Sequence, residues 1–554
     1  MNFSNQGLSP ADLVELAIVA LLVLGVLAWR PWAAALARRL EPHPGWSMAM
    51  IAALPVILRL ALLPHHPAPV PDLYDEFSHL LEADTLRHFR LANPPHPMAQ
   101  FFETFFVLQR PTYASIYPPG QGLILAAGWT LFGHPWAGVL LATAAFCGLC
   151  YWMLRGWVSP PWALAGGALA VVEFGPLNQW MNEYWGGEWI AASGCLVFGA
   201  LPRLQTARRR RDALLLGVGL SIHLITRPYE SLFLFLAVAL FWAPRPGPGW
   251  KGLAAQVPTI AAPVLLAAML LAVQNKQVTG SWTTMPEALS QYQYGVPAAL
   301  TIQAKATPHV PLTEQQQMGY KMQRAFQGER AETPGTFLQR LEYRVRYYRF
   351  FFLAPLYLAI GAFLFTLRER RYQWVALTLV LFALGTNFFP AFQLHYVAAV
   401  TCLFVLVSVA GLERISHRLP EAARLLLLLC GAQFVFWYGL HALFDTAGWS
   451  AAVRRFETWD AINHENPERR VLVNRKLEGI PGKLLVLVRY SPRHIFQDEW
   501  VYNRAAIDEA RIVWARDLGA AENQRLLRYY PDRTALLLEP DAQPPRLGPY
   551  LAAP

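Results

Sequence analysis

The sequence has few charged residues and few cysteines. Only 15% of its 554 residues are charged, whereas 55% are hydrophobic. That apolar share is too high for a set of soluble domains of this length. The five cysteines all lie within apolar runs, where a thiol serves as a small apolar filler, so no disulfide framework is indicated. We therefore expect an α-helical polytopic membrane protein.

Apolar runs long enough to cross a bilayer recur along the chain. A membrane helix needs roughly 20 residues to cross the ~30 Å hydrocarbon core, and it satisfies its own backbone groups where lipid offers them no partner. We predict about twelve spans, at residues 12–29, 46–63, 136–154, 162–177, 189–203, 212–226, 229–243, 253–274, 346–367, 372–389, 396–412 and 423–444. No small-residue cleavage site follows the first run, so we expect it to be retained rather than removed as a secretory signal.

The arginines decide the expected orientation. They cluster in short loops after the first, fifth, ninth and eleventh predicted spans, and these loops share one side if the spans alternate. Cytoplasmic loops carry the excess of basic residues. Both termini and two long loops, at 64–120 and 275–345, then face outward, which in a bacterium is the periplasmic side of the inner membrane. The net charge of +10 is accounted for by such loops and indicates no nucleic-acid partner. The apolar stretch 120–133 is short, and we place it at the outer interface.

The composition changes after the last predicted span. We predict a transmembrane domain at residues 1–444 and a small periplasmic α/β domain at 445–554. Buried strands are expected at 482–490, 510–518 and 534–541, with a helix at 519–531. This alternation favours a partly parallel sheet. The segment has no GxGxxG or Walker motif, so nothing in it indicates nucleotide binding, and we expect a structural or acceptor-positioning role.

Polar residues gather at the predicted outer ends of the spans, whereas the span centres are almost uncharged. Five separate segments contribute them: Asp75 and Glu76, Tyr117, Asn182 and Glu183, Arg227 and Glu230, and His395 and Tyr396. A transporter would instead carry ionisable residues or broken helices near the bilayer midplane. Arginine binds phosphate well, and a nearby carboxylate can act as a general base. The set suits a reaction between a membrane-anchored phosphate ester and a polar acceptor.

Part of this pattern resembles a known family. The Asp75–Glu76 pair just after a span, followed by YPPGQGLILAAGWTLFG at 117–133, is similar to the C-type membrane glycosyltransferases, the GT-C fold. That superfamily includes protein O-mannosyltransferases and lipid A aminoarabinose transferases. The resemblance covers roughly residues 46–412. It implies transfer of a sugar from a polyprenyl-phosphate donor at the outer membrane face, with inversion and without a covalent intermediate.

The resemblance also implies roles for single residues. Asp75 matches the catalytic carboxylate, acting as general base, and Glu76 matches the adjacent acid. The donor phosphate would be held by Arg227, His395, Tyr396 and Tyr117. Substrate-binding residues would include Asn182, Glu183 and Glu230.

One departure leaves the sugar open. Aminoarabinose transferases carry a lysine before the Pro-Pro pair, where this chain has Ile116 and Tyr117. The acceptor, whether glycan, lipid or protein, is open as well. The alternatives are a transporter or flippase of a lipid-linked glycan, and a noncatalytic membrane assembly protein.

Histidines of the first outer loop raise the question of a metal. They share the loop with several carboxylates, at His65, His66, His79 and His96, but no pair has a recognised ligand spacing. We therefore name no metal ligand and no required cofactor, and a divalent metal stays an alternative.

Overall fold

A computed structural model describes Ala20 and residues 43–71, 73–242, 254–328, 331–443 and 468–551. The predicted first span, apart from Ala20, lies outside the described residues. So does the predicted boundary between the two domains at residues 444 and 445.

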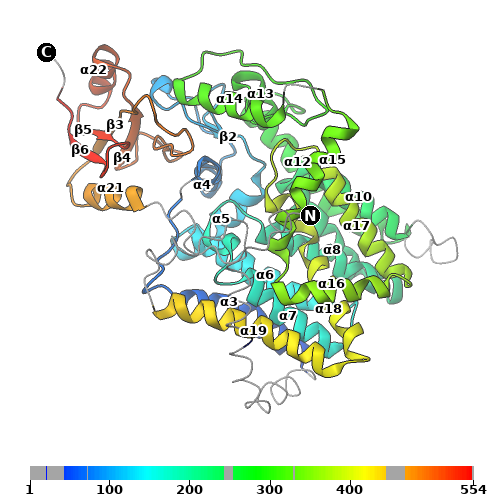
Figure 1. The fold of residues 1–554 in the computed structure, drawn as a ribbon. Helices are drawn as coiled ribbons and strands as arrows, with labels where there is room; N and C mark the ends of the chain where they lie inside the picture. The colour runs from blue at the N-terminus through cyan, green and yellow to red at the C-terminus, as the bar shows by residue number, and fades with distance from the viewer. Residues whose placement is uncertain are drawn as a thin grey trace.

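Helices build the membrane part of the chain (Figure 1). Several begin at a proline, because the N–H that proline lacks would have no partner in the first turn of a helix. The helices are α3 (Pro44–Ala61), α6 (Trp136–Leu154), α7 (Pro160–Phe174), α8 (Glu188–Thr206), α9 (Arg210–Thr226), α10 (Pro228–Trp242), α12 (Val257–Thr279), α17 (Arg370–Thr386), α18 (Thr401–Ser416) and α19 (Pro420–Leu443). Although far apart in sequence, α3 and α19 lie side by side, and the Tyr438 hydroxyl donates to the Leu58 carbonyl at 2.9 Å.

Five described helices are long and apolar enough to cross a membrane, or six if one bent pair counts as a span. They are α3, α6, α12, the helix Leu394–Ser416 formed by η8 (Leu394–Val400) with α18, and α19. Among the other predicted spans, α7 and α10 have 15 residues, and α9 and α17 have 17, short of the roughly 20 that a crossing needs. The multi-pass prediction is thus supported, but the count of twelve is not confirmed.

The predicted span 346–367 is not one continuous helix. It consists of η5 (Val345–Phe351), η6 (Ala354–Leu356), α16 (Tyr357–Phe363) and η7 (Leu364–Thr366). The chain bends by 112° between Pro334–Phe351 and Ala354–Thr366. Leu353 has an extended backbone at the break, and Pro355 follows it. Proline has no N–H for the helical ladder and its ring clashes with the preceding turn, which explains the interruption.

The two long segments predicted to face outward, here called the outer segments, are folded. The first comprises α4 (Tyr74–Arg87), η3 (Ala99–Phe101) and an antiparallel ribbon of β1 (Val107–Leu108) and β2 (Ala114–Ser115), and α5 (Pro119–Phe132) follows. With 14 residues, α5 is too short to cross and packs against α4 and α6. The second contains α13 (Pro286–Tyr294), α14 (Glu314–Gln327) and α15 (Pro334–Arg344). The 3₁₀ turn η4 (Gln179–Asn182) precedes α8.

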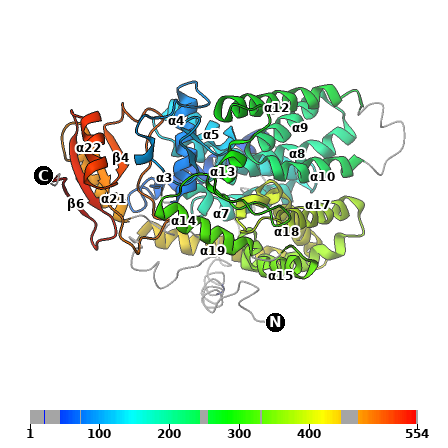
Figure 2. The same ribbon diagram turned by 90° about the horizontal axis from the view of Figure 1, so that it is seen from above.

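The C-terminal region confirms the predicted strands and helix. It contains α21 (Glu468–Glu478), β3 (Leu484–Val488), β4 (Ile512–Arg516), α22 (Ala520–Tyr529), β5 (Thr534–Glu539) and β6 (Arg546–Pro549). The sheet order is β4-β3-β5-β6, with β3 parallel to both neighbours and β6 antiparallel to β5. Both views place this sheet at one end of the molecule, beyond α4 (Figures 1 and 2).

The sheet shares a core with the first outer segment. Alternate residues of β3 point to opposite faces. Leu484 and Val486 pack in a cluster with α21, whereas Leu485 and Leu487 pack in a cluster that contains Leu81 of α4. The small α/β unit therefore buries one of its faces against the segment that follows α3.

Close packing of α16 on α18 gives a test of the fold. A Cβ atom on Gly411 of α18 would lie 1.9 Å from the Ala359 carbonyl oxygen of α16. We expect Gly411→Ala to lower the midpoint of thermal unfolding in detergent, because overpacking costs about 1–3 kcal/mol. The matched control is Gly361→Ala on the facing helix, where a Cβ meets nothing within 4 Å and should stabilise by up to about 1 kcal/mol. Equal midpoints for the two variants would contradict this packing.

Candidate functional site

Asp75 lies in the first turn of α4 and is buried, with 6% of its surface exposed. The free N–H groups and the dipole at a helix start favour acidic residues there. The neighbouring Glu76 fixes the turn: Oε2 accepts from the Leu73 amide at 3.0 Å, and Oε1 accepts from the Tyr184 amide at 2.9 Å. Glu76 therefore ties the start of α4 to the segment between η4 and α8, and a catalytic role for it stays a prediction.

Tyr117 is the direct neighbour of Asp75. Its hydroxyl donates a hydrogen bond to Asp75 Oδ1. The segment that carries Tyr117 is pinned to α4, because the Tyr117 amide donates to Ser115 Oγ at 3.1 Å, and that hydroxyl lies 2.8 Å from Ser78 Oγ. The Tyr117 hydroxyl thus lies on the predicted base, and the predicted contact of Tyr117 with a donor phosphate stays a prediction.

Arg227 is placed by the proline that follows it. It ends α9 with φ −139° and ψ 76°, outside the helical region, as expected for a residue before proline. Its Nη1 lies 3.9 Å from Glu230 Oε1, and its guanidinium carbon lies 5.2 Å from the centre of the Tyr396 ring. The charge of Arg227 also lowers the pKa of Asp75. Four predicted residues from three separate segments, Asp75, Arg227 with Glu230, and Tyr396, therefore share one electrostatic neighbourhood.

His395 lies beside this group. It is buried in η8, with its ring 4.9 Å from Trp185 and 5.0 Å from Tyr396. Trp185 belongs to the same polar segment as Asn182 and Glu183. The predicted convergence of His395 and Tyr396 on the neighbourhood of Arg227 is thus seen in the structure, while their contact with a phosphate stays a prediction.

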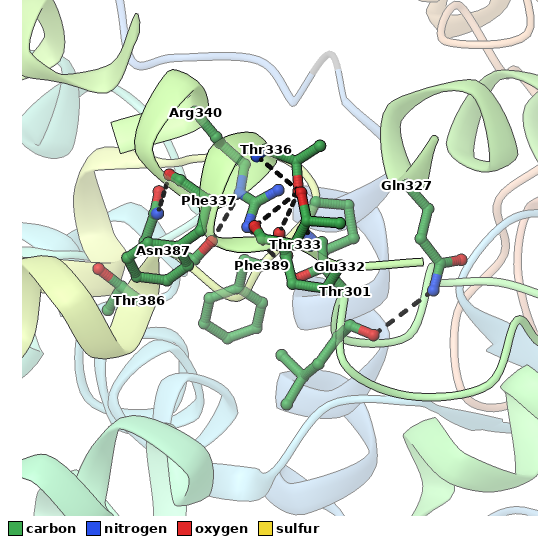
Figure 3. A network of polar contacts seen from close by, with 12 residues as sticks. Thr301, Gln327, Glu332, Thr333, Thr336, Phe337, Arg340, Thr386, Asn387 and Phe389 are labelled. Atoms are coloured by element: carbon green, nitrogen blue, oxygen red, sulfur yellow. Dashed lines mark hydrogen bonds and ion pairs between the residues drawn. The ribbon is translucent and has the colours of Figure 1, made fainter. Parts of the chain in front are cut away.

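A polar network joins the second outer segment to the turn that precedes Tyr396 (Figure 3). Arg340 of α15 donates to the Asn387 carbonyl at 2.7 Å and pairs with Glu332. The Asn387 side chain donates back to the Phe337 carbonyl at 2.8 Å. Two residues on, the Phe389 ring lies 4.4 Å from the Tyr396 ring. Helix α15 therefore holds Asn387, in the turn whose Phe389 packs on Tyr396.

Burial shifts the pKa values of Asp75 and His79. It raises the pKa of Asp75 to about 7, against the hydrogen bond from Tyr117 and the charge of Arg227, which both lower it. Burial and the Arg227 charge lower the pKa of His79 to about 3. Asp75 therefore titrates near neutral pH, where a general base works best, and His79 is neutral there.

Asn182 and Glu183 form hydrogen bonds with neighbouring protein groups. Asn182 Oδ1 accepts from Arg59 Nε at 2.7 Å, and its amide group donates to the Asn178 and Pro176 carbonyls. Glu183 accepts from Gln179 at 2.8 Å. These bonds hold η4 to the end of α3, so the contacts of Asn182 are structural. A substrate-binding role for either residue stays a prediction.

The histidines do not form a metal site with other ligands in the described part of the chain. Its His, Cys, Asp and Glu side chains include no group of three or more that could hold a metal ion. His66 lies 3.1 Å from the His441 carbonyl, and His96 pairs with Asp508 of the C-terminal domain.

Two buried polar residues near Tyr117 were missed from the sequence. Glu82 of α4 and Gln274 of α12 hydrogen-bond to each other at 2.8 Å, and Gln274 also donates to the Tyr117 carbonyl at 3.0 Å. The spacing of Asp75, His79 and Glu82, which places all three on one helix face, was the available signal. Gln274 has no such signal, because it lies at the end of an apolar helix.

Comparison with known proteins identifies the fold. No protein-family model and no curated protein matches the sequence. The structure is similar to ArnT from Cupriavidus metallidurans in the apo state, with a TM-score of 0.50, 11% identity and coverage of 89% of this chain and 93% of that chain. For the same protein bound to undecaprenyl phosphate, the TM-score is 0.50, with 12% identity and coverage of 90% and 93%.

A third similar structure is the archaeal oligosaccharyltransferase AglB from Archaeoglobus fulgidus, in complex with an inhibitory peptide and a dolichol-phosphate. Its TM-score is 0.39, with 12% identity and coverage of 89% of this chain and 69% of that chain. The similarity to ArnT extends over nearly the whole chain and confirms the resemblance seen in the sequence. The chain has the fold of the C-type membrane glycosyltransferases, the GT-C fold.

Proposed function

We propose that this chain is an integral membrane glycosyltransferase that transfers a sugar from a polyprenyl-phosphate donor to an acceptor at the periplasmic face. One observation carries the proposal: a buried aspartate on α4, hydrogen-bonded by Tyr117, lies in the field of Arg227 at the end of α9. ArnT, whose fold this chain shares, has been solved bound to undecaprenyl phosphate, which supports a lipid phosphate as the donor's leaving group.

In the proposed reaction, Asp75 is the general base. Its carboxylate takes the proton from the acceptor's hydroxyl or amine as the heteroatom attacks the anomeric carbon. The bond from that carbon to the phosphate oxygen breaks, and its electron pair leaves with the polyprenyl phosphate. The Arg227 guanidinium binds the phosphate and balances the charge it gains. A single displacement inverts the anomeric centre and leaves no covalent intermediate.

Asp75→Asn tests the base. We expect transfer to fall about 10²- to 10⁴-fold, the usual contribution of a general base, with expression and membrane insertion unchanged. The measurement is transfer by purified protein from a panel of polyprenyl-phosphate sugars. Asp212→Asn is the matched control, since Asp212 is also buried and in the first turn of a helix, α9, at the end away from Arg227. Full transfer by Asp75→Asn would refute the assignment.

The pH dependence of transfer tests the hydrogen bond from Tyr117. A general base acts as the carboxylate, so kcat/KM should rise with pH through the pKa of Asp75, about 7, and level off above it. In Tyr117→Phe the bond that lowers this pKa is lost, so the rise should shift to higher pH. Phenylalanine keeps the ring that stacks on His79. If both proteins give the same midpoint, Tyr117 does not tune the base.

Arg227→Ala tests donor binding. Hydrogen bonds to charged groups contribute about 1.5–3 kcal/mol, so the donor concentration for half-maximal rate should rise at least tenfold. Because Arg227 also lowers the pKa of Asp75, both proteins should be compared at pH 9, where the base is ionised in each. Arg227→Lys keeps the charge but loses the planar guanidinium, which can donate to two phosphate oxygens at once. We expect its half-maximal donor concentration to lie between those of the wild type and the alanine variant. An unchanged donor requirement in the alanine variant would exclude Arg227 from phosphate binding.

A further inference from the structure

Helix α4 presents two different faces. Phe77 and Asp84 face the C-terminal domain: the Phe77 ring stacks on Tyr502 at 4.3 Å and 5°, and Asp84 Oδ2 accepts from the Ala505 amide at 2.9 Å. Asp75, His79 and Glu82 follow the spacing i, i+4, i+7 and share a second face. That second face carries the proposed base and two further buried titratable groups that the proposed reaction does not use.

These groups leave polar atoms without partners. Within the described residues, neither ring nitrogen of His79 has a hydrogen-bond partner, and the same holds for Glu82 Oε2 and Gln274 Oε1. The three side chains are almost fully buried, with 4%, 5% and 2% exposed. An unpartnered buried polar group costs about 1–3 kcal/mol, so several in one place indicate that a ligand supplies their partners.

The three residues form one connected group around Tyr117. The His79 ring stacks on the Tyr117 ring at 4.2 Å and 23°. Gln274 Nε2 bridges the Tyr117 carbonyl and Glu82 Oε1. The Tyr117 hydroxyl also donates to Asp75. Tyr117 therefore connects this group of residues to the proposed base.

The hydrogen-bond donors and acceptors among these atoms indicate which kind of ligand would pair with them. A neutral imidazole offers one donor and one acceptor, and the free oxygen of Gln274 is an acceptor only. An ionised phosphate diester has acceptors alone and would leave the Gln274 oxygen and one His79 nitrogen unpaired. A hydroxyl group both donates and accepts, so neighbouring hydroxyls on one molecule satisfy the whole set.

We propose that His79, Glu82 and Gln274 form a binding site for hydroxyl groups of the transferred sugar, beside Asp75. The inference rests on the proposed function and adds the part of the donor that this face of α4 recognises. It places the sugar against His79, Glu82 and Gln274, and the phosphate against Arg227.

His79→Phe tests the site, because phenylalanine keeps the stack on Tyr117 and removes both nitrogens. One lost hydrogen bond should lower kcat/KM for the donor about 3- to 10-fold. Donor analogues that each lack one hydroxyl then locate the contact. For one analogue, wild type should lose this factor while His79→Phe loses nothing further, since the partner is already gone. Glu82→Gln, of the same size, should show the same non-additivity for another hydroxyl.

The matched control is His309→Phe. His309 stacks on Tyr292 at 4.1 Å and 13° on an exposed part of the second outer segment, so the same chemical change there should leave donor discrimination unaltered. Losses that add for every analogue, or an effect on the acceptor's KM alone, would overturn the site. Neither result would touch the difference between wild type and Asp75→Asn, whereas a wild-type protein without transfer would refute the proposed function itself.

Discussion

The structure depends on how α4 is held between the membrane helices and the C-terminal sheet. A helix of 14 residues is marginal by itself in water, so its position comes from packing on both sides. On one side, Leu81 joins the core of β3, and Phe77 lies between Tyr502 and the guanidinium of Arg470, 4.5 Å away. On the other side, the Cγ atom of Glu82 lies so close to α5 that a Cβ on Gly122 would meet it at 2.5 Å. The depth at which Asp75 is buried is therefore set jointly by the two parts of the chain.

A single buried arginine extends this coupling to the second outer segment. Arg516 of β4 pairs with Glu499, donates to the Glu103 carbonyl at 2.6 Å and donates to Gln315 of α14. The Arg516 and Glu499 side chains are almost fully buried. A buried ion pair stabilises only when the remaining donors and acceptors are also satisfied, and here those partners come from both outer segments. Arg516 therefore joins the C-terminal sheet to both of these segments, while a structural or acceptor-positioning role of the C-terminal region stays a prediction.

Local sequence patterns were sufficient to predict three strands and one helix of the C-terminal region, but not the contacts that these and other elements make. Residues 482–490, 510–518 and 534–541 are apolar runs bounded by turn residues, and each contains a strand. The break near Pro355 was overlooked because hydropathy continues across it. The hydrogen bond between Glu76 and the Tyr184 amide could not be predicted from local patterns, since the two residues are distant in sequence. His79 and Glu82 read as part of a solvated acidic surface helix, and only packing by α5 and α12 turns them into a buried polar cluster. The sequence brought out the candidate residues, and tertiary packing determined which of their polar atoms have hydrogen-bond partners within the described residues.

Under the proposed function, donor binding and base strength are linked through Arg227. Its positive charge lowers the pKa of Asp75 in the free protein. A bound phosphate supplies a negative charge beside the same guanidinium and cancels part of that effect. The pKa of Asp75 would then rise in the donor complex, which makes the carboxylate a stronger base but lowers the fraction that is ionised at neutral pH. Without the donor, the charge of Arg227 keeps more of Asp75 ionised, as a weaker base. The close pairing of Tyr117 with Asp75 works in the same direction as Arg227, because it too stabilises the ionised carboxylate. Under the proposed function, the ionisation of the base and the binding of the leaving phosphate therefore depend on the same guanidinium.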